Sequence, residues 1–536
     1  MSLTALVKRK CKPINDFFIM LFPIKEKGPS DFRFTLGEIA MFHQLVSESN
    51  SHGIDDQSWD DLLLNQYSRE LSSEVSIFGQ QILHHRLRNE VSHGDTQLRH
   101  LLQNSVLQTE IHFLCQPLRN AECEISATLF GTPIAEPPPW SKYLWAFSIA
   151  FFVSLALATI TSFAWAGVGI SLFLLIAIQT RFYDRIQMWD FQVRSLQQML
   201  GTYVNLGASA KKKSDPALAP FLTEITQLRE ICRVLTPSEL VNAIPGASAY
   251  CEWFFLENVR QYFKGLKTVN LHLKLLRECY LRIAHLEADL ALARHLQRMP
   301  TFCWAEVDVA ANIRFEDVVH PLLNHAIPLS LCLQNKGAFI SGQNGIGKST
   351  LLRTIGLNLV TARAFGFCYA RNAKVPIGPV FTSMQNEDSL LGGESLYIAE
   401  LRRAKELLAA SKSAKKCVFI VDEIFRGTNH VESISAAAAV LHSLAKNGVV
   451  IVSSHNLVLS TLLNDCLTSF CVTAEGGEQN HLRLLPGVLA NPNGIALLSE
   501  HGFGETIELK ASRVFDWLNG YLAHPTRYVD VLGEPN

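Results

Sequence analysis

The sequence predicts a multi-domain chain, with a mainly α-helical N-terminal half that contains a transmembrane helical hairpin, followed by a C-terminal α/β domain. Three observations carry this prediction. A stretch of about 38 residues, from Tyr143 to Thr180, contains no charged side chain. Apolar residues recur at helical spacing in the segments on either side of it. Late in the chain, an apolar strand runs directly into a glycine-rich loop and then into a helix.

The boundaries of the segments follow from these changes of pattern. We expect, in order, an N-terminal tail (1–54), a helical core segment (55–135), the hairpin (136–183), a second helical segment (184–304), the α/β domain (305–515) and a C-terminal tail (516–536). The formal net charge is −1, so no overall basic field attracts nucleic acid, and contact with DNA would need a local patch. The 12 cysteines form no Cys-x-x-Cys pair, which indicates reduced thiols in a cytosolic compartment and argues against a zinc site.

The first helical segment is clearest at Ile77–Arg88, where apolar residues recur every three or four positions. This stretch contains His84 and His85, which have only a distant His93 as a further histidine and no cluster of carboxylates nearby. We therefore expect both histidines on the surface of the helix and not as metal ligands.

The uncharged stretch is too long for one span. As a single helix it would measure about 57 Å, against a hydrocarbon core of about 30 Å, so two spans of about 17 to 18 residues with a turn near Thr161 to Gly169 fit better. Aromatic residues flank both ends, and Lys142 and Arg181 mark both ends as cytoplasmic. The prediction is a two-span membrane protein, inserted through residues 143–180, with the N-terminal segment and the α/β domain in the cytoplasm. The alternative is a buried hairpin in a large soluble core.

The second helical segment begins with a helix at Asp184–Tyr203, followed by a polar loop that carries the lysine triplet 211–213. A solvated loop accounts for this triplet better than a phosphate contact. From Leu276 to Ala293, apolar residues repeat in alternating threes and fours, which predicts a long helix that packs against another helix and ends at Pro300.

The α/β domain is built around the stretch Phe339–Gly356, in which a strand, a Gly-x-x-x-x-Gly-Lys-Ser loop and a helix follow one another. Glycines let backbone N–H groups close around phosphates, and the helix N-terminus favours an anion. Lys348 would reach the outer phosphates and Ser349 would offer its hydroxyl to Mg²⁺. The pattern predicts a site for ATP and Mg²⁺, formed by Gly342, Gln343, Asn344, Gly345, Ile346, Gly347, Lys348, Ser349 and Thr350.

The acidic partner of this loop follows about 74 residues later. An apolar strand at Cys417–Val421 ends in Asp422 and Glu423, which is typical of a Walker B element. Asp422 would hold Mg²⁺, and Glu423 would orient or polarise the attacking water. A further strand, Val449–Val452, leads to His455, which could sense the γ-phosphate or play a structural role.

These motifs resemble those of the MutS family of DNA mismatch repair ATPases, specifically its C-terminal domain V. The loop GQNGIGKST has Asn344 at the family's Asn position, although Gln343 replaces the usual Pro. DEIFRGTN, residues 422–429, is similar to the extended Walker B, with Phe425 where Gly is common. Between them, Ser395 and Glu400 match a Ser and a helical Glu of the family. The resemblance is specific over roughly residues 305–510 and weaker over 55–115 and 230–300.

The resemblance implies a homodimer formed through the ATPase domains, with two composite ATP sites. Ser395 would reach across to the γ-phosphate of the other subunit, so that Lys348, Glu423, His455 and Ser395 form the catalytic set. ATP would bridge the pair and hydrolysis would loosen it. The family's Phe-x-Glu mismatch reader has no counterpart before residue 55. The chain is most similar to membrane-anchored MutS-like ATPases that lack this reader.

Three functional hypotheses remain open from the sequence. The first is a membrane-tethered MutS-like ATPase, an ATP-gated dimeric switch that acts on an unknown protein partner or on DNA. The second is a soluble-type DNA repair or recombination ATPase that binds mismatched or branched DNA. The third is an ABC-type transporter ATPase, which Leu391–Glu394 superficially resembles. Against the third, the interval between loop and Walker B is short and a single hairpin cannot build a transport path.

Overall fold

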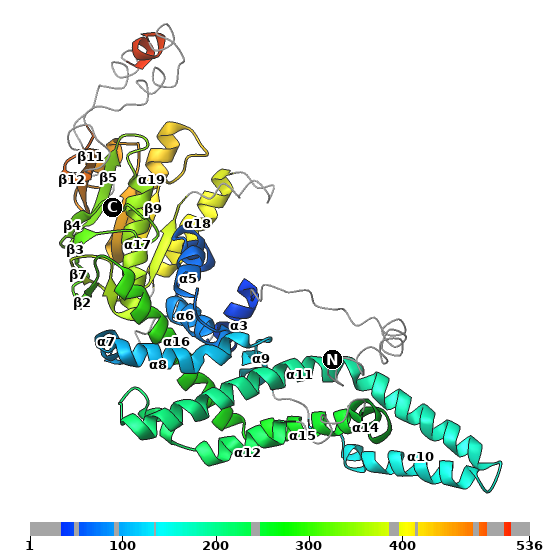
Figure 1. The fold of residues 1–536 in the computed structure, drawn as a ribbon. Helices are drawn as coiled ribbons and strands as arrows, with labels where there is room; N and C mark the ends of the chain where they lie inside the picture. The colour runs from blue at the N-terminus through cyan, green and yellow to red at the C-terminus, as the bar shows by residue number, and fades with distance from the viewer. Residues whose placement is uncertain are drawn as a thin grey trace.

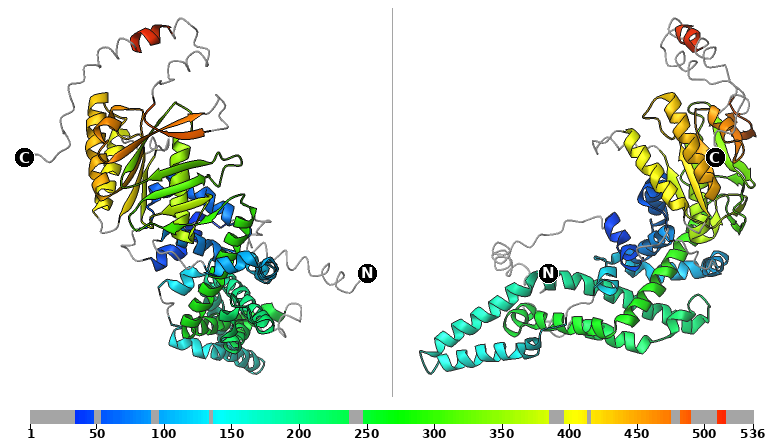
Figure 2. Two further views of the ribbon diagram at one scale, coloured as in Figure 1. Left: turned by 90° about the vertical axis from the view of Figure 1, so that its left-hand side faces the viewer. Right: turned by 180° about the vertical axis from the view of Figure 1, so that it is seen from behind.

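The computed structural model describes residues 34–47, 53–89, 96–132, 136–236, 247–384, 396–412, 416–474, 482–489 and 509–515. Within these ranges the N-terminal half is mainly helical and the C-terminal part is α/β, as the sequence predicts. Figure 1 shows the α/β domain above, a helical core below it, and a helical arm that projects away from both. Figure 2 shows the same arrangement from two further sides.

The helical core is assembled from short helices packed around one long helix. The long helix is α16 (Leu273–Arg298), which packs against α6, α7 and α8 and carries the apolar repeat that the sequence predicts there. The surrounding helices are α3 (Leu36–Val46), α4 (Asp56–Asp61), α5 (Leu64–Leu71), α6 (Ile77–Arg88), α7 (Thr96–Gln103), α8 (Ser105–Cys115), η1 (Gln116–Asn120) and α9 (Ser126–Phe130).

Two expectations about this core were wrong. The segment expected as an N-terminal tail contains α3, which begins with a capping box between Thr35 and Glu38 and buries Phe42 against α6. His84 and His85 are not surface residues, because α3 and α4 cover this side of α6 and leave both histidines buried. Burial lowers the pKa of His84 to about 3, so the ring is neutral at physiological pH.

The arm is an antiparallel pair of helices. After η2 (Pro139–Tyr143), α10 (Leu144–Ala158) runs outward and α11 (Ala164–Lys213) runs back, so the turn lies a few residues before the expected position. Within the described residues, Pro139–Ala158 and Ala164–Lys213 are long and apolar enough to cross a membrane, by length and composition. Most of their apolar stretch is exposed, for example Phe173 at 70% and Ile170 at 64%. Within the described residues of this chain, the hairpin is therefore not covered by a core.

Helix α11 continues far beyond the apolar stretch. Its 50 residues correspond to about 75 Å, and the boundary expected at residue 183 falls inside this continuous helix. The lysine triplet 211–213 lies in its last turn and not in a loop, which is favourable because cations stabilise a helix C-terminus. The helix ends where Ser214 adopts a left-handed conformation with φ of 49°.

The helices that follow pack along α11, and α14 also contacts α10. They are η3 (Ala219–Leu222), α12 (Ile225–Leu235), α14 (Ala247–Phe255) and α15 (Glu257–Leu271). The ring of Phe263 in α15 packs on Phe182 and Trp140 at the base of the arm, at centroid distances of 5.3 and 5.8 Å. The arm is thus anchored to the core by aromatic packing at its base.

The α/β domain is organised on a six-stranded sheet in the order β12-β11-β5-β10-β9-β8, in which only β12 is antiparallel to its neighbour. A four-stranded sheet in the order β2-β7-β3-β4 and a β1–β6 pair complete the domain. The strands are β1 (Cys303–Trp304), β2 (Glu306–Val307), β3 (Ile313–Val318), β4 (Leu329–Leu333), β5 (Gly337–Gly342), β6 (Phe367–Cys368), β7 (Asn372–Val375), β8 (Val380–Ser383), β9 (Cys417–Asp422), β10 (Gly448–Ser453), β11 (Leu467–Ala474) and β12 (Leu482–Pro486). The helices are α17 (Lys348–Phe365), α18 (Leu396–Ser411), α19 (His430–Asn447) and α20 (Val458–Leu462).

Buried polar contacts join the helical core to this domain. Tyr369 follows β6, and its hydroxyl meets the hydroxyl of Tyr67 in α5 at 2.7 Å and Nε2 of His295 in α16 at 2.9 Å. Arg363 of α17 donates to the carbonyl of Leu87 at 2.7 Å. Since buried polar groups are costly when unpaired, these bonds fix how the core sits under α17.

Candidate functional site

Three neighbouring parallel strands deliver the predicted site residues to one edge of the main sheet. Strands β5, β10 and β9 are adjacent, and Ser453 at the end of β10 is in register with Ile340 of β5 and with Asp422 of β9. All residues of β5 and β9 are buried, which explains their largely apolar sequences. Because the carboxyl ends of parallel strands share an edge, the loop after β5 and the acids after β9 meet there.

The predicted phosphate loop connects β5 to α17 as expected. Gly347 is the N-cap of α17 and has φ of 99°, a conformation that an L residue with a side chain would strain to adopt. It offers no side chain to cap the helix, so no side-chain cap bond occupies the N–H groups of the first turn. Gln343, Asn344 and Gly345 are exposed at the tip of the loop. The loop is thus a backbone cradle at a helix N-terminus, the arrangement that suits a phosphate.

Lys348 begins α17 and folds back over the loop. Its Nζ donates to the carbonyl oxygens of Gly342 and Gln343, each at 3.0 Å. Burial lowers the pKa of Lys348, and the nearby carboxylates of Glu423 and Asp422 partly oppose this shift. The ammonium is therefore held at the mouth of the cradle by acceptors that phosphate oxygens can replace.

Ser349 and Asp422 form the predicted metal pair. The Ser349 hydroxyl donates to Oδ2 of Asp422 at 2.5 Å, and the Ser453 hydroxyl donates to Oδ1 at 2.8 Å. No cluster of three or more His, Cys, Asp or Glu suited to a metal occurs among the described residues. Mg²⁺ nevertheless fits, because it binds through one or two protein oxygens together with substrate phosphates and does not need a complete protein cage.

Glu423 is held from two sides. His455 donates from Nε2 to Oε1 at 2.8 Å, and Arg426 forms an ion pair with Oε2. Burial alone would raise the pKa of Glu423, but the hydrogen bond from His455 and the charge of Arg426 outweigh it and lower the pKa. The backbone at Glu423 is left-handed, with φ of 53°, and its N–H donates to the Ser453 carbonyl at 2.9 Å. This acid is kept ionised and fixed in direction, as a group that accepts a proton or orients water must be.

The loop after Glu423 explains an unusual residue in the sequence. Phe425 has φ of 59°, which is rare for a bulky residue and natural for the glycine that is common at this position in the family it resembles. Its ring is buried and packs on Tyr397 of α18 at a centroid distance of 6.1 Å. Burial of the ring compensates for backbone strain at this site.

Glu400 is a residue whose role the sequence did not reveal. Its carboxylate accepts from the N–H groups of Arg426 and Gly427, at 3.2 and 3.4 Å. A Cβ atom at Gly427 would lie 2.7 Å from the backbone nitrogen of Tyr397, so only glycine allows this close approach of loop to helix. Helix α18 therefore anchors the loop that carries Glu423 and Arg426. The pattern Arg-Gly after Asp-Glu was visible, but the contact across about 26 residues was not.

Arg403, also on α18, ties this helix and strand β8 to the helical core. Its guanidinium pairs with Asp55 at 2.8 Å and donates to the Thr382 carbonyl at 2.5 Å. Beside it, Asp61 of α4 accepts from the Thr382 hydroxyl at 2.6 Å and from the Met384 N–H at 2.9 Å. Burial raises the pKa of Asp61 to about 6, although these bonds and Arg403 act in the opposite direction. The core thus contacts strand β8 through buried polar bonds.

The structure brings together Lys348, Ser349, Asp422, Glu423 and His455, and the roles assigned to them stay predictions. The remaining predicted catalytic residue, Ser395, lies outside the described residues, and its cross-subunit role stays a prediction.

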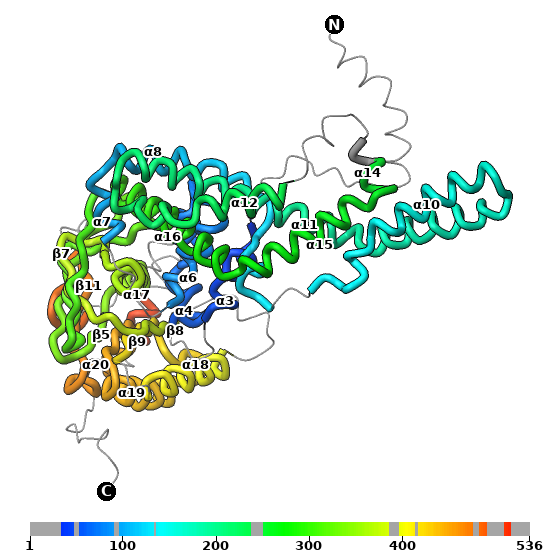
Figure 3. Tube along the Cα trace, turned by 90° about the horizontal axis from the view of Figure 1, so that it is seen from below, coloured from blue at the N-terminus to red at the C-terminus, as the bar shows by residue number. Residues whose placement is uncertain are grey.

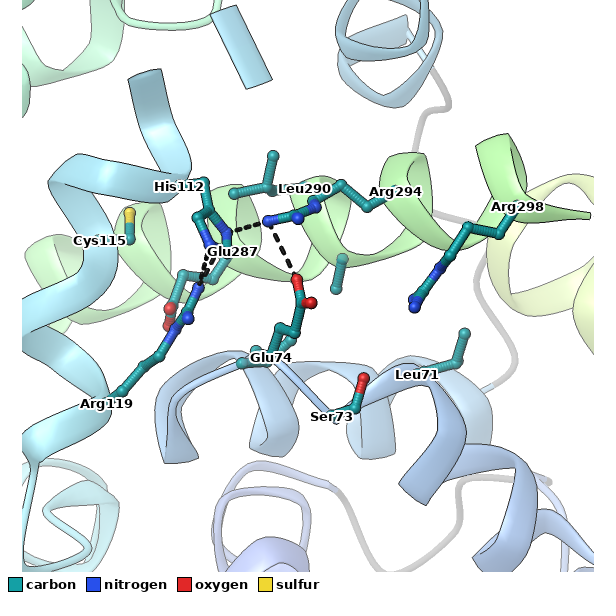
Figure 4. A pocket seen from close by; sticks show the side chains of 12 residues that line it. Leu71, Ser73, Glu74, His112, Cys115, Arg119, Glu287, Leu290, Arg294 and Arg298 are labelled. Atoms are coloured by element: carbon teal, nitrogen blue, oxygen red, sulfur yellow. Dashed lines mark hydrogen bonds and ion pairs between the residues drawn. The ribbon is translucent and has the colours of Figure 1, made fainter. Parts of the chain in front are cut away.

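A cavity in the helical core is not a second candidate for the nucleotide. It measures about 20 Å³, enough for roughly one water molecule. As Figure 4 shows, Arg119, Arg294 and His112 meet there with Glu74, and none of the lining residues comes from the phosphate loop. Arg294 pairs with Glu74, and both Arg119 and Arg294 bond to His112.

Comparison with known proteins agrees with the geometry. The profile of MutS domain V matches residues 338–513. The DNA mismatch repair protein MutS of Methanothrix thermoacetophila is 28% identical over 223 residues, which cover 39% of this chain and 26% of that protein. A protein of the same name from Thermus thermophilus is 25% identical over 248 residues, covering 44% and 30%. That from Thermotoga neapolitana is 35% identical over 127 residues, covering 23% and 16%.

These matches span less than a third of the length of the relatives. The domain V match covers the phosphate loop, Asp422 and Glu423. Residues 338–513 are thus a domain of the MutS domain V family.

Proposed function

We propose that the chain is a membrane-tethered ATPase of the MutS type, which binds and hydrolyses ATP with Mg²⁺ and acts as an ATP-gated switch. The observation that carries this proposal is the convergence of Lys348, Ser349, Asp422 and the His455–Glu423 pair at one sheet edge. A purely structural role would not require these three features at one sheet edge: a lysine that bonds to loop carbonyls, a hydroxyl that bonds to a buried carboxylate, and an ionised acid held by two neighbouring side chains.

Each residue has a distinct task in this proposal. Lys348 exchanges its two loop carbonyls for phosphate oxygens, so it neutralises charge without leaving its position. Ser349 and Asp422 would hold Mg²⁺, which supplies further neutralisation of the phosphates when bound. Glu423, kept ionised by its neighbours, accepts a hydrogen bond from the attacking water, and His455 keeps its carboxylate aimed.

The membrane is proposed as the location because of the arm. Residues 143–180 carry no charge, and the arm exposes large apolar side chains around its outer half, including Phe152, Ile160, Phe163 and Phe173. A monomeric soluble surface rarely exposes so continuous an apolar patch. We propose that the hairpin enters the bilayer as two spans and that both of its ends, the N-terminal segment and the ATPase domain lie on the cytoplasmic side.

A homodimer through the ATPase domains is proposed from the family relationship, with Ser395 completing the site of the other subunit. A mixture of Ser395→Ala and Lys348→Ala subunits tests this. Each variant alone should be inactive, whereas a mixed dimer contains one site with an intact Lys348 and an intact Ser395. Failure of the mixture to recover any activity, with mixed dimers present, would refute the cross-subunit role.

The ATPase proposal is tested with detergent-solubilised full-length protein. Glu423→Gln should bind ATP like the wild type and hydrolyse it at least about 100-fold more slowly. Glu230→Gln, an exposed residue of α12, is the matched control and should have the wild-type rate. Unchanged turnover in Glu423→Gln would remove this residue from the catalytic role.

DNA and an unidentified protein remain the candidate partners. The same ATPase assay is run with homoduplex, mismatched and branched DNA across a salt series. Stimulation that depends on DNA structure and weakens with salt would favour a repair or recombination role. A steady rate with every DNA would favour a switch that serves a protein or lipid partner.

A further inference from the structure

Helix α14 (Ala247–Phe255) lies against the first half and middle of α10 in the arm. The ring of Phe254 packs on Phe151 of α10 and the ring of Phe255 stacks on Phe152, each pair with a centroid distance of 5.3 Å. Figures 1 and 3 show α14 beside the start of α10, away from the rest of the core. The contact was not foreseen from the sequence, because about 100 residues separate the two helices.

The position of this contact along the arm is informative. Phe152 lies six residues before the end of α10, so only about 9 Å of α10 extends beyond it. The uncharged run begins at Tyr143, about 14 Å before Phe152 on the same helix. A lipid phase that covers the uncharged run must therefore also reach the aromatic end of α14.

The side chains of α14 suit this environment. Tyr250 is 67% exposed and Phe255 is 45% exposed, and Trp253 and Phe254 are the other aromatic residues of the helix. Aromatic side chains of this kind are enriched where hydrocarbon meets headgroups. The helix carries one charged residue, Glu252, which is exposed and can remain among headgroups and water. Exposed aromatic rings would be costly in water but are favourable in a bilayer interface.

We propose that α14 is a second lipid-contacting element, whose aromatic end enters the bilayer beside the hairpin and marks the boundary between hydrocarbon and headgroups on the side of the ATPase domain. This inference rests on the proposed membrane insertion of the arm. The occupant is lipid because the aromatic end of α14 continues the exposed apolar surface of α10 through the Phe254–Phe151 and Phe255–Phe152 contacts.

The test uses three exposed phenylalanines on three helices, replaced one at a time by the photo-crosslinker p-benzoylphenylalanine in the full-length chain. Phe255 reports on α14, Phe173 in α11 reports on the hairpin, and Phe113 in α8, which is 71% exposed, is the control outside the membrane. Each variant is reconstituted into phosphatidylcholine and phosphatidylglycerol vesicles whose acyl chains carry an alkyne tag. We expect lipid adducts at positions 173 and 255 that are about ten-fold above the adduct at position 113.

The other outcomes separate the two proposals. Lipid adducts at position 173 but not at position 255 would overturn the role of α14 and leave the insertion of the arm intact. Adducts at neither position would overturn both. A crosslink from position 255 to a second copy of the chain, without lipid, would also overturn the inference, since the aromatic face would then be a protein contact.

Discussion

Replacing Asp61 by Asn should change how the stability of the protein depends on pH. Asp61 is 1% exposed, and burial raises its pKa to about 6 in the folded protein. A carboxyl whose pKa is raised by folding binds its proton more tightly in the folded state. The contribution of Asp61 to the free energy of unfolding is therefore most favourable at low pH. It is lost as the pH rises from the pKa of Asp61 in the unfolded state, near 3.8, to its pKa in the folded state, near 6.

The magnitude follows from the two pKa values. Ionisation of Asp61 costs the folded state about 3 kcal/mol above pH 7 and about half of that at pH 5. Asn keeps an oxygen that can accept from Thr382 and Met384 but cannot ionise. The free energy of unfolding of Asp61→Asn, relative to wild type, should therefore rise by about 1.4 kcal/mol between pH 5.0 and pH 7.5.

The measurement is urea unfolding followed by tryptophan fluorescence at these two pH values. Asp60→Asn, an exposed neighbour in the same helix, serves as the control and should show no such change. A difference between Asp61→Asn and wild type that is the same at both pH values would refute the reasoning, since Asp61 would then be ionised to the same extent in both folded and unfolded states.

Three further predictions concern the site and its support. Arg403→Met should lower the free energy of unfolding by about 2–4 kcal/mol, because it leaves Asp55 without its cation, and a loss below about 0.5 kcal/mol in urea unfolding would contradict this. Phe425→Gly should be more stable than Phe425→Ala by about 1 kcal/mol, the reverse of the usual order, because both lose the ring but only glycine relaxes the left-handed backbone. Thermal unfolding of the two variants tests this prediction, and a more stable Phe425→Ala variant would show that the backbone at this position is not strained. Arg426→Gln should raise the pKa of Glu423 and shift the acid limb of the ATPase pH profile to higher pH, whereas an unmoved limb would show that the ion pair does not tune this acid.

The sheet edge that carries the candidate site could be predicted because its residues lie in two short, recognisable stretches of sequence. A loop that wraps phosphate needs glycines at fixed intervals before Lys348, and a buried strand that ends in Asp422 and Glu423 is recognisable from its apolar run. The register of parallel strands then brings the two stretches together without further information.

The supporting contacts could not be predicted, because they join residues that are far apart in the chain. Asp61 and Thr382 are separated by 321 positions, and nothing near either residue indicates the other. The burial of His84 depends likewise on α3, whose apolar face is short and whose position is set by tertiary packing. The prediction of a loop at the lysine triplet 211–213 was wrong for a different reason. Three consecutive charged residues are typical of a loop, and nothing in the triplet itself indicates that the preceding helix continues through it.

Because α11 is one continuous helix, its contacts at the base determine how the arm is rotated about the helix axis. Phe182 packs on Phe263, and Trp189 packs closely against Gly265, so both ends of a seven-residue interval are locked to α15. Each added or removed residue would turn everything beyond it by about 100° around the helix axis and shift it by about 1.5 Å. The direction in which each side of the arm faces is therefore set by the number of residues in α11. We expect insertions within α11 to disturb the structure far more than substitutions do.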